Sequence, residues 1–249
     1  MARYSAVFFD LFDTLVRFDR DRLPTVQVDG RTVKSTVGHL HALLARHVPG
    51  CTLEACYRAL LGSWQEAERL RDIDDREVPA HERFTDFFRR LALDPATLPP
   101  GLGTALIEAH RRELAKAAEF PAHHGPLLER LARTRRLAVV SNFDYSPTAR
   151  GILEAAGVLD LFAAVVVSDE VGWRKPHPDI FAEAFRRTGA DPARTLFVGD
   201  RLDIDVVGAH RAGMDAAWLS PGGEGLPPDA VAPRYVIRDL AELEAIVEA

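Results

Sequence analysis

The chain has 249 residues, of which 47% are hydrophobic and 27% are charged, and its formal net charge is -6. This length is enough for one large α/β domain, alone or with a smaller inserted domain, and it excludes a small fold held together by disulfide bonds. The net charge does not indicate a nucleic-acid surface, and no apolar run reaches the roughly 18 residues of a membrane span, so we expect a cytoplasmic protein that binds neither nucleic acid nor membrane.

The first predicted element is a strand, AVFFD, at residues 6–10. It is almost entirely apolar, as expected for a strand that is buried on both faces of a parallel sheet. The next strand of this kind begins only at Leu137. We therefore predict that residues 17–120 are an insertion, and that residues 1–16 and 121–249 form the core domain.

The predicted insertion begins with two alternating runs that flank Asp29-Gly30, a strong signal for a β-hairpin near residues 24–34. Apolar residues with helical spacing follow in four segments, so the insertion is predicted to be a helical cap domain. These segments are residues 35–48, 53–70, 81–93 and 103–120.

Both cysteines of the chain, Cys51 and Cys56, fall in this insertion. They are five positions apart in a stretch with helical character, where side chains at that spacing point to different sides. We predict two separate buried thiols, as is usual in a reducing cytoplasm, and no shared metal site.

From residue 121 onward, short apolar runs alternate with amphipathic segments, the pattern of a parallel sheet built from strand–helix–strand units. The fold class is therefore predicted to be α/β, with a Rossmann-like parallel sheet. The strands are LAVVS, AAVVVS, TLFVGD and AAWLS, and a last edge strand and helix lie in YVIRDLAELEAIVEA.

Polar residues stand directly after several of these strands, where an open parallel sheet binds its ligands. Asp10 follows the first strand, Ser141 and Asn142 end the second, Asp200 ends TLFVGD, and Lys175 lies in the loop EVGWRKPHP. Each has an ordinary structural explanation as a turn, cap or surface residue. A nucleophile, a cation and further acids that converge are what phosphoryl transfer through an aspartate needs.

The order of these motifs resembles the haloacid dehalogenase-like hydrolase superfamily, with its helical cap inserted after the first motif. The matching residues are DxxxT (Asp10 to Thr14), SN (Ser141, Asn142), KP (Lys175, Pro176) and GDxxxxD (Gly199, Asp200, Asp205). The stretches AVVSNFD and GWRKPHPDIF are also similar to the group that contains haloacid dehalogenase-like hydrolase domain-containing protein 3.

The resemblance implies a Mg²⁺-dependent phosphatase that acts on a small phosphorylated metabolite. Asp10 would form an aspartyl phosphate, with Lys175 as its catalytic partner. Residues that would hold the phosphate are Thr14, Ser141, Asn142 and Lys175. Residues that would hold Mg²⁺ are Asp10, the Phe12 backbone carbonyl, Asp200 and Asp205, with Asp203 as a rival of Asp205.

Phe12 departs from the pattern, because phosphatases of this superfamily carry a second aspartate there to protonate the leaving group. We assign Asp13, where the family has glycine, to hydrogen bonding within its loop or to helix capping, and a catalytic or metal-shell role is the alternative. Two alternatives therefore stay open: a 2-haloacid dehalogenase, whose motif also has an aromatic residue at this position, and a weakly active protein that binds a phosphorylated ligand or a partner. A phosphonatase is a further alternative, with Lys34 or Lys116 as its cap lysine.

Overall fold

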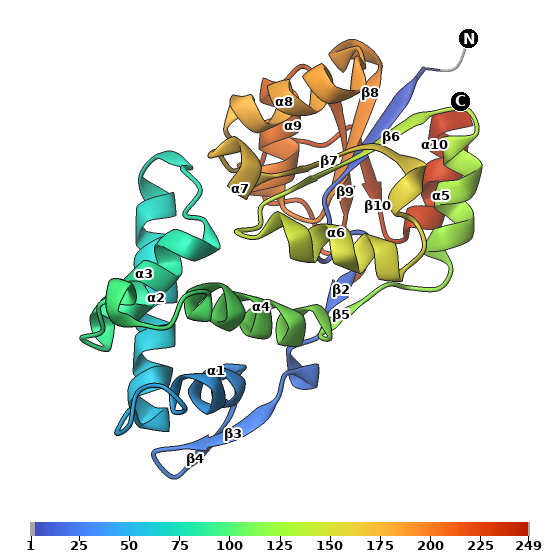
Figure 1. Ribbon diagram of the computed structural model, residues 1–249. Helices are drawn as coiled ribbons and strands as arrows, with labels where there is room; N and C mark the ends of the chain where they lie inside the picture. Colours follow the sequence, from blue (N-terminus) through green and yellow to red (C-terminus); the bar gives the residue numbers. More distant parts are fainter. Residues whose placement is uncertain (1–2, 249) are drawn as a thin grey trace. The chain divides into compact units, whose positions relative to one another are not determined.

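The computed structural model describes residues 3–248, and a six-stranded parallel sheet forms the centre of its larger unit (Figure 1). This unit comprises residues 1–17 and 120–249, and residues 18–119 form a second, mostly helical unit. The strands follow the order β10-β9-β8-β1-β6-β7. Their bounds are Ala6–Phe9 (β1), Arg136–Ser141 (β6), Phe162–Val167 (β7), Thr195–Gly199 (β8), Asp215–Leu219 (β9) and Tyr235–Ile237 (β10).

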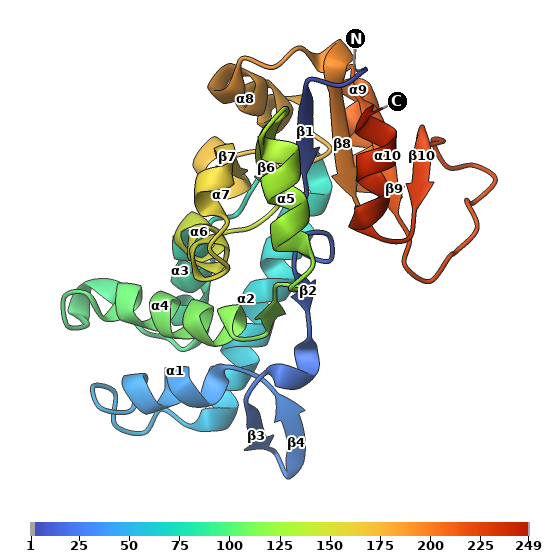
Figure 2. The same ribbon diagram turned by 90° about the vertical axis from the view of Figure 1, so that its right-hand side faces the viewer.

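Helices cover both faces of this sheet, α8 and α9 on one face and α5 and α10 on the other (Figures 1 and 2). The helices of this unit are α5 (His124–Ala132), α6 (Ser146–Ala155), α7 (Ser168–Val171), α8 (Pro178–Thr188), α9 (Val207–Arg211) and α10 (Leu243–Glu248). A π-helical turn, η5 (Leu202–Val206), precedes α9. The prediction of an α/β fold with a Rossmann-like parallel sheet is confirmed.

The apolar strands explain why this sheet lies at the centre of the unit. All four residues of β1 are at most 1% exposed, because β1 is flanked by β6 and β8 and covered on both faces. On one face, Phe8 and Phe197 pack against Phe181 of α8. Pro178 begins that helix and Gly189 ends it with a φ of 64°, a left-handed conformation that glycine adopts without strain.

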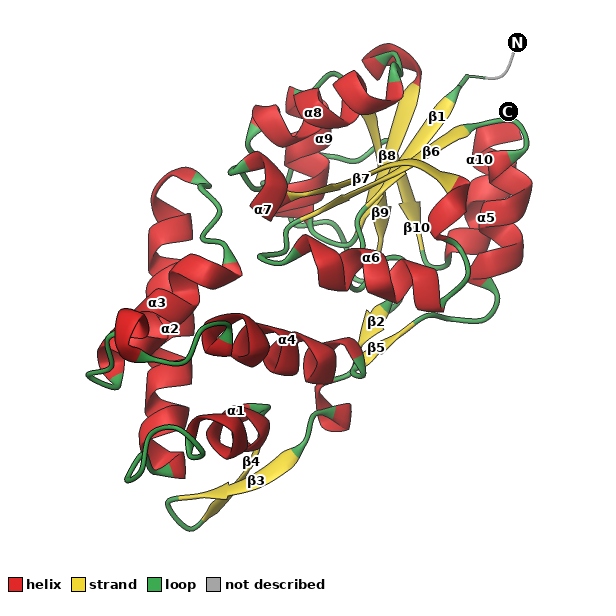
Figure 3. Ribbon diagram, in the orientation of Figure 1, coloured by secondary structure: helices red, strands yellow, loops and turns green. Residues whose placement is uncertain are grey.

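The smaller unit consists of helices and one hairpin (Figure 3). Its elements are β3 (Thr25–Val28), β4 (Arg31–Lys34), α1 (Val37–Leu44), α2 (Leu53–Asp74), α3 (Ala80–Arg90) and α4 (Leu102–Ala115). Strands β3 and β4 pair antiparallel, and Asp29 and Gly30 join them with φ values of 48° and 73°. Both residues of such a tight turn need positive φ, which explains the Asp-Gly pair.

The prediction that the two cysteine side chains point to different sides is wrong, and Cys51 is only partly buried. Cys51 Sγ and Cys56 Sγ lie 3.3 Å apart. The reason is that α2 begins only after the cap residue Thr52, so Cys51 belongs to the preceding loop and the helical spacing argument does not apply to it.

Two further short strands differ from the expected helical pattern. Helix α4 ends at Ala115, and Ala118–Glu119 forms a strand, β5, that pairs with β2 (Arg17–Phe18). Neither strand has enough residues for an alternation of apolar and polar side chains to be recognised. Within residues 3–248, none of the helices combines the length and the apolar character that a membrane crossing requires.

Candidate active site

The candidate site begins at Asp10, directly after the central strand β1. Strands β6 and β7 lie on one side of β1, and the later strands β8, β9 and β10 lie on its other side. The strand order therefore reverses at β1, and open α/β sheets bind ligands at such a point. The Asp10 backbone N–H donates to the Val198 carbonyl oxygen at 2.9 Å, which extends the β1–β8 pairing to this residue. Asp10 is 9% exposed.

Lys175 lies next to Asp10 and is 2% exposed. Its Nζ atom is 2.6 Å from Asp10 Oδ1 and 2.8 Å from Asp205 Oδ1. It also lies 5.1 Å from the centre of the Phe197 ring, whose face attracts a cation. A single ammonium thus joins the carboxylates that follow β1 and β8.

The motif after β8 supplies two acids whose positions depend on local backbone geometry. Asp200 follows the strand directly, and Asp205 ends the first turn of η5 and is 1% exposed. A Cβ atom at Gly199 would lie 2.3 Å from Asp205 Oδ2, so glycine is needed for the carboxylate to approach the chain. Asp203 points elsewhere and pairs with Arg201 at 2.8 Å.

The three carboxylates form a cluster in which one oxygen each from Asp10, Asp200 and Asp205 lie within 4.8 Å of one another. When all three carboxylates are ionised, they and the one ammonium of Lys175 leave two negative charges, since -3 and +1 give -2. A divalent cation would balance this charge, and carboxylate oxygens are the ligands that Mg²⁺ prefers.

The crowding of these acids changes their proton affinities. Burial raises the pKa of Asp10 to about 7, because the attraction of Lys175 is opposed by the nearby charges of Asp205 and Asp200. Burial and the charge of Asp205 likewise raise the pKa of Asp200 to about 6. Burial alone would lower the pKa of Lys175, but its pairs with Asp10 and Asp205 raise it, so the ammonium stays charged.

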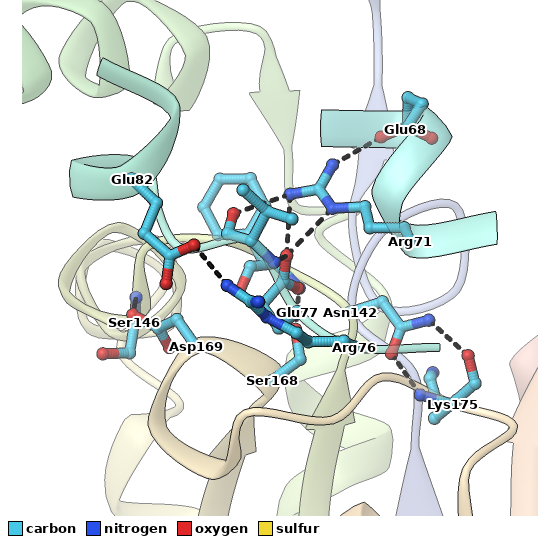
Figure 4. A network of polar contacts seen from close by, with 12 residues as sticks. Glu68, Arg71, Arg76, Glu77, Glu82, Asn142, Ser146, Ser168, Asp169 and Lys175 are labelled. Carbon is cyan, nitrogen blue, oxygen red and sulfur yellow. Dashed lines mark hydrogen bonds and ion pairs between the residues drawn. The ribbon is translucent and has the colours of Figure 1, made fainter. Parts of the chain in front are cut away.

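The other predicted phosphate ligands have different surroundings. Ser141 ends β6, and its buried Oγ atom has no hydrogen-bond partner within residues 3–248. Thr14 Oγ1 is 3.5 Å from Asp200 Oδ1. Asn142 faces the Lys175 backbone: its Nδ2 donates to the Lys175 carbonyl at 2.9 Å, and its Oδ1 accepts from the Lys175 N–H at 2.7 Å (Figure 4). These two bonds fix the loop that carries the ammonium.

A cavity of about 190 Å³ opens at the cluster. Asp10, Lys175, Asp200 and Asp205 line it, together with Phe12, Asp13, Asn142, Arg174, Arg201 and Ile204, whereas Ser141 and Thr14 do not.

Phe12 and Asp13 both border the cavity but differ in their setting. The ring of Phe12 lies against Phe143, with ring centres 4.9 Å apart, so an aromatic contact occupies the second position after Asp10. Asp13 is exposed, has a φ of 57°, and contributes to the raised pKa of Asp200.

The sequence analysis did not identify Trp218 as a residue of the site, because in the sequence it appears only as an apolar residue of a buried strand. Its indole Nε1–H donates to the Asp200 carbonyl oxygen at 2.8 Å. A tryptophan that needs a partner for its N–H, near the end of the strand that follows the acidic motif, is the signal that could have identified it.

The chain is similar to known proteins in sequence and in fold. Residues 4–213 match the family model described as haloacid dehalogenase-like hydrolase. The chain is 36% identical over 172 residues to a glyceraldehyde 3-phosphate phosphatase of Methanopyrus kandleri. The aligned residues cover 68% of this chain and 72% of that protein. It is 39% identical over 119 residues, 46% of each chain, to human haloacid dehalogenase-like hydrolase domain-containing protein 3.

A similar solved structure is a 2-haloacid dehalogenase from Pseudomonas syringae, with a TM-score of 0.71 and 23% identity over 98% of both chains. At this identity the similarity concerns the fold. Because the family model covers most of the chain and the sequence and fold comparisons agree, the protein belongs to the haloacid dehalogenase-like hydrolases.

Proposed function

We propose that this hydrolase is a Mg²⁺-dependent phosphatase that acts on a small phosphorylated metabolite through an aspartyl phosphate on Asp10. The observation that carries the proposal is the charge of the site: three clustered carboxylates around one buried ammonium, with an excess of two negative charges. The relative from Methanopyrus kandleri, named as a phosphatase of glyceraldehyde 3-phosphate, supports a small phosphate ester as substrate.

The residues of the chain divide the work as follows. The ionised Asp10 carboxylate attacks phosphorus, an acyl–phosphate bond forms, and the bond from phosphorus to the leaving oxygen breaks. Lys175 holds Asp10 in position through the 2.6 Å contact and places a fixed positive charge beside the reacting phosphoryl group. Water then attacks the aspartyl phosphate and releases inorganic phosphate, which restores the Asp10 carboxylate.

The donor set fits a magnesium ion, because buried carboxylates with raised pKa values gain from a cation that replaces their protons. Asp10, Asp200, Asp205 and the Phe12 carbonyl would hold the ion, and it would supply charge neutralisation between the nucleophile and the phosphate. Trp218 fixes the Asp200 backbone for this role. Thr14 and Ser141 are proposed as additional hydroxyl donors to the phosphate.

Phe12 restricts which substrates react well, because it cannot protonate a leaving alkoxide. We infer that phosphates with good leaving groups, such as aryl and acyl phosphates, are hydrolysed faster than simple alkyl phosphates. The loss of general acid help is commonly worth on the order of 10² to 10⁴ in rate.

The second candidate is 2-haloacid dehalogenation, which Phe12 favours because a halide leaves without a proton. The carboxylate cluster disfavours it. Dehalogenation replaces a halide on carbon without a metal ion, so it has no use for Asp200 and Asp205 as metal ligands. A weakly active protein that binds a phosphorylated ligand or a partner is the third candidate, and the buried pair of Asp10 and Lys175 gives a pure binding protein no advantage.

The test is phosphate release from p-nitrophenyl phosphate and acetyl phosphate, with Mg²⁺ and with a chelator, beside halide release from 2-chloropropionate. We expect phosphate release that requires Mg²⁺ and disappears in Asp10→Asn. Metal-independent halide release without phosphatase activity would establish the dehalogenase instead, and silence in all assays would favour the binding protein.

A matched pair of variants tests the metal assignment. Asp205→Asn should abolish the Mg²⁺-dependent activity, because Asp205 belongs to the cluster. Asp203→Asn, two residues earlier, should retain it, because Asp203 is exposed and pairs with Arg201. Equal losses in both variants would contradict the assignment of Asp205.

A further inference from the structure

The two cysteines of the helical unit are in direct contact. Cys51 and Cys56 are the only cysteines among 249 residues, both are free thiols, and their Sγ atoms are 3.3 Å apart. Only four residues separate them in the sequence, and the start of α2 after Thr52 brings the Cys51 side chain onto Cys56. Their contact raises the question of whether they react with each other.

The two thiols differ in their access to solvent. Cys51 is partly exposed and lies in the loop between α1 and α2, in which Ala45, Arg46, His47, Pro49 and Gly50 are exposed. Cys56 is fully buried at 0% exposure in the first turns of α2, and burial raises the pKa of its thiol to about 12. A soluble oxidant would therefore reach Cys51 first, and Cys56 remains a protonated thiol that solvent does not reach.

The backbone around the pair allows the closer approach that a bond requires. A disulfide needs about 2.05 Å between sulfurs, so the 3.3 Å contact must shorten by about 1.2 Å. Cys56 is fixed, because its N–H donates to the Thr52 carbonyl at 3.1 Å inside the helix. Cys51 lies outside the helix after Gly50, which has a φ of 88° and open space around it, and the Cys51 carbonyl oxygen is 3.0 Å from His41 Nε2. The closer approach therefore has to come from the Cys51 side chain and the Gly50 backbone.

We propose that Cys51 and Cys56 form a reversible oxidation site that closes into an intrachain disulfide in response to a peroxide. In the first step the Cys51 sulfur attacks the peroxide, the oxygen–oxygen bond breaks, and Cys51 becomes a sulfenic acid with release of water. In the second step the Cys56 sulfur attacks the Cys51 sulfur, the sulfur–oxygen bond breaks, and a second water leaves. The peroxide accepts the two electrons, and two equivalents of a small thiol return them.

The disulfide would tie the loop before α2 to the buried side of that helix, across the capping residue Thr52. The Thr52 side chain already accepts a hydrogen bond from the Ala55 N–H at 3.1 Å, so the start of α2 is defined before the bond forms. The expected effect is a more stable helical unit in the oxidised protein, seen as a higher unfolding temperature. This site contains no residue of the Asp10 cluster, so the inference does not depend on the proposed phosphatase activity.

The first test uses the full-length wild-type protein treated with hydrogen peroxide. Oxidation should lower the intact mass by about 2 Da under denaturing, non-reducing conditions, through the loss of two hydrogens. Thiol titration of the denatured protein should fall from two groups to none, and dithiothreitol should reverse both changes. Two thiols that survive the treatment, or disulfide-linked dimers in place of the intrachain bond, would overturn the proposal.

The second test separates the roles of the two thiols. In Cys56→Ser the sulfenic acid on Cys51 has no partner and should be trapped by dimedone after peroxide treatment. Cys51→Ser keeps only the buried Cys56 and should be labelled at least about tenfold more slowly, provided that circular dichroism shows a folded protein. Equally fast labelling of both folded variants would contradict the assigned order of reaction.

Discussion

Removal of one negative charge from the carboxylate cluster should stabilise the metal-free protein. The pKa of Asp200 is raised from 3.8 to about 6, which corresponds to about 3 kcal/mol at 1.36 kcal/mol per unit. Asp200 is only partly buried, and solvent screens part of this effect, so we expect about 1–2 kcal/mol. Asp200→Asn, which keeps the shape of the side chain, should raise the free energy of unfolding by this amount at pH 8.

The assay is urea unfolding of wild type and Asp200→Asn in chelator and in Mg²⁺. In chelator the variant should be more stable, and in saturating Mg²⁺ the wild type should gain more, because the ion binds the folded state and needs the carboxylate. The difference should shrink as the pH falls from 7 toward 4. A carboxyl group whose pKa is raised in the folded state costs stability only where that state loses the proton, so protonation removes the penalty.

Asp203→Asn is the control, because this exposed side chain lies outside the cluster. Its free energy of unfolding should change by no more than about 0.5 kcal/mol. An Asp200→Asn variant that is less stable than wild type in chelator at pH 8 would refute the view that burial and the charge of Asp205 make the ionised Asp200 carboxylate destabilising.

Three more outcomes follow from the same site. Lys175→Met should lower the free energy of unfolding by about 3–5 kcal/mol at pH 8 in urea titrations, because the buried charges of Asp10 and Asp205 lose their cation; unchanged stability would contradict this role. Trp218→Phe should raise the Mg²⁺ concentration for half-maximal phosphatase activity about 5- to 10-fold, the equivalent of one hydrogen bond, and leave kcat at saturating Mg²⁺ nearly unchanged. Mg²⁺ affinity, measured by thermal shift, should rise between pH 6 and 8 and then level off, since protons leave Asp200 near pH 6 and Asp10 near pH 7; a flat profile would exclude competition between protons and the ion.

The sheet was predictable because its strands are nearly pure apolar runs, and such runs have few stable alternatives to a strand buried on both faces. Both ends of helix α8 were predictable. Pro178 fixes a backbone angle suited to the first turn of a helix, and Gly189 adopts the left-handed conformation that ends one. The strands β2 and β5 were not predictable, because each has only two residues and so shows no alternation of apolar and polar side chains. They form only when segments about a hundred residues apart in the sequence pair with each other.

The site was predictable to the level of strand ends, because the carboxyl ends of parallel strands meet at one edge. The sequence favoured Asp205 over Asp203 only through the resemblance to the family, and not through any predicted geometry. The π-helical turn of η5 directs Asp205 to Lys175 and Asp203 to Arg201, and spacing alone does not reveal a turn of that type. The contact of Cys51 with Cys56 was missed for a related reason, since it depends on where a helix begins.

The central place of β1 has a consequence for the way the chain folds. Ala6 of β1 is aligned with Arg136 of β6 and with Thr195 of β8, so its two partners are synthesised more than a hundred residues after it. The helical unit, residues 18–119, precedes both partners in the chain. The pairing of β1 therefore closes long loops of the chain, and contacts between residues so far apart in sequence form late and slow the folding of the sheet.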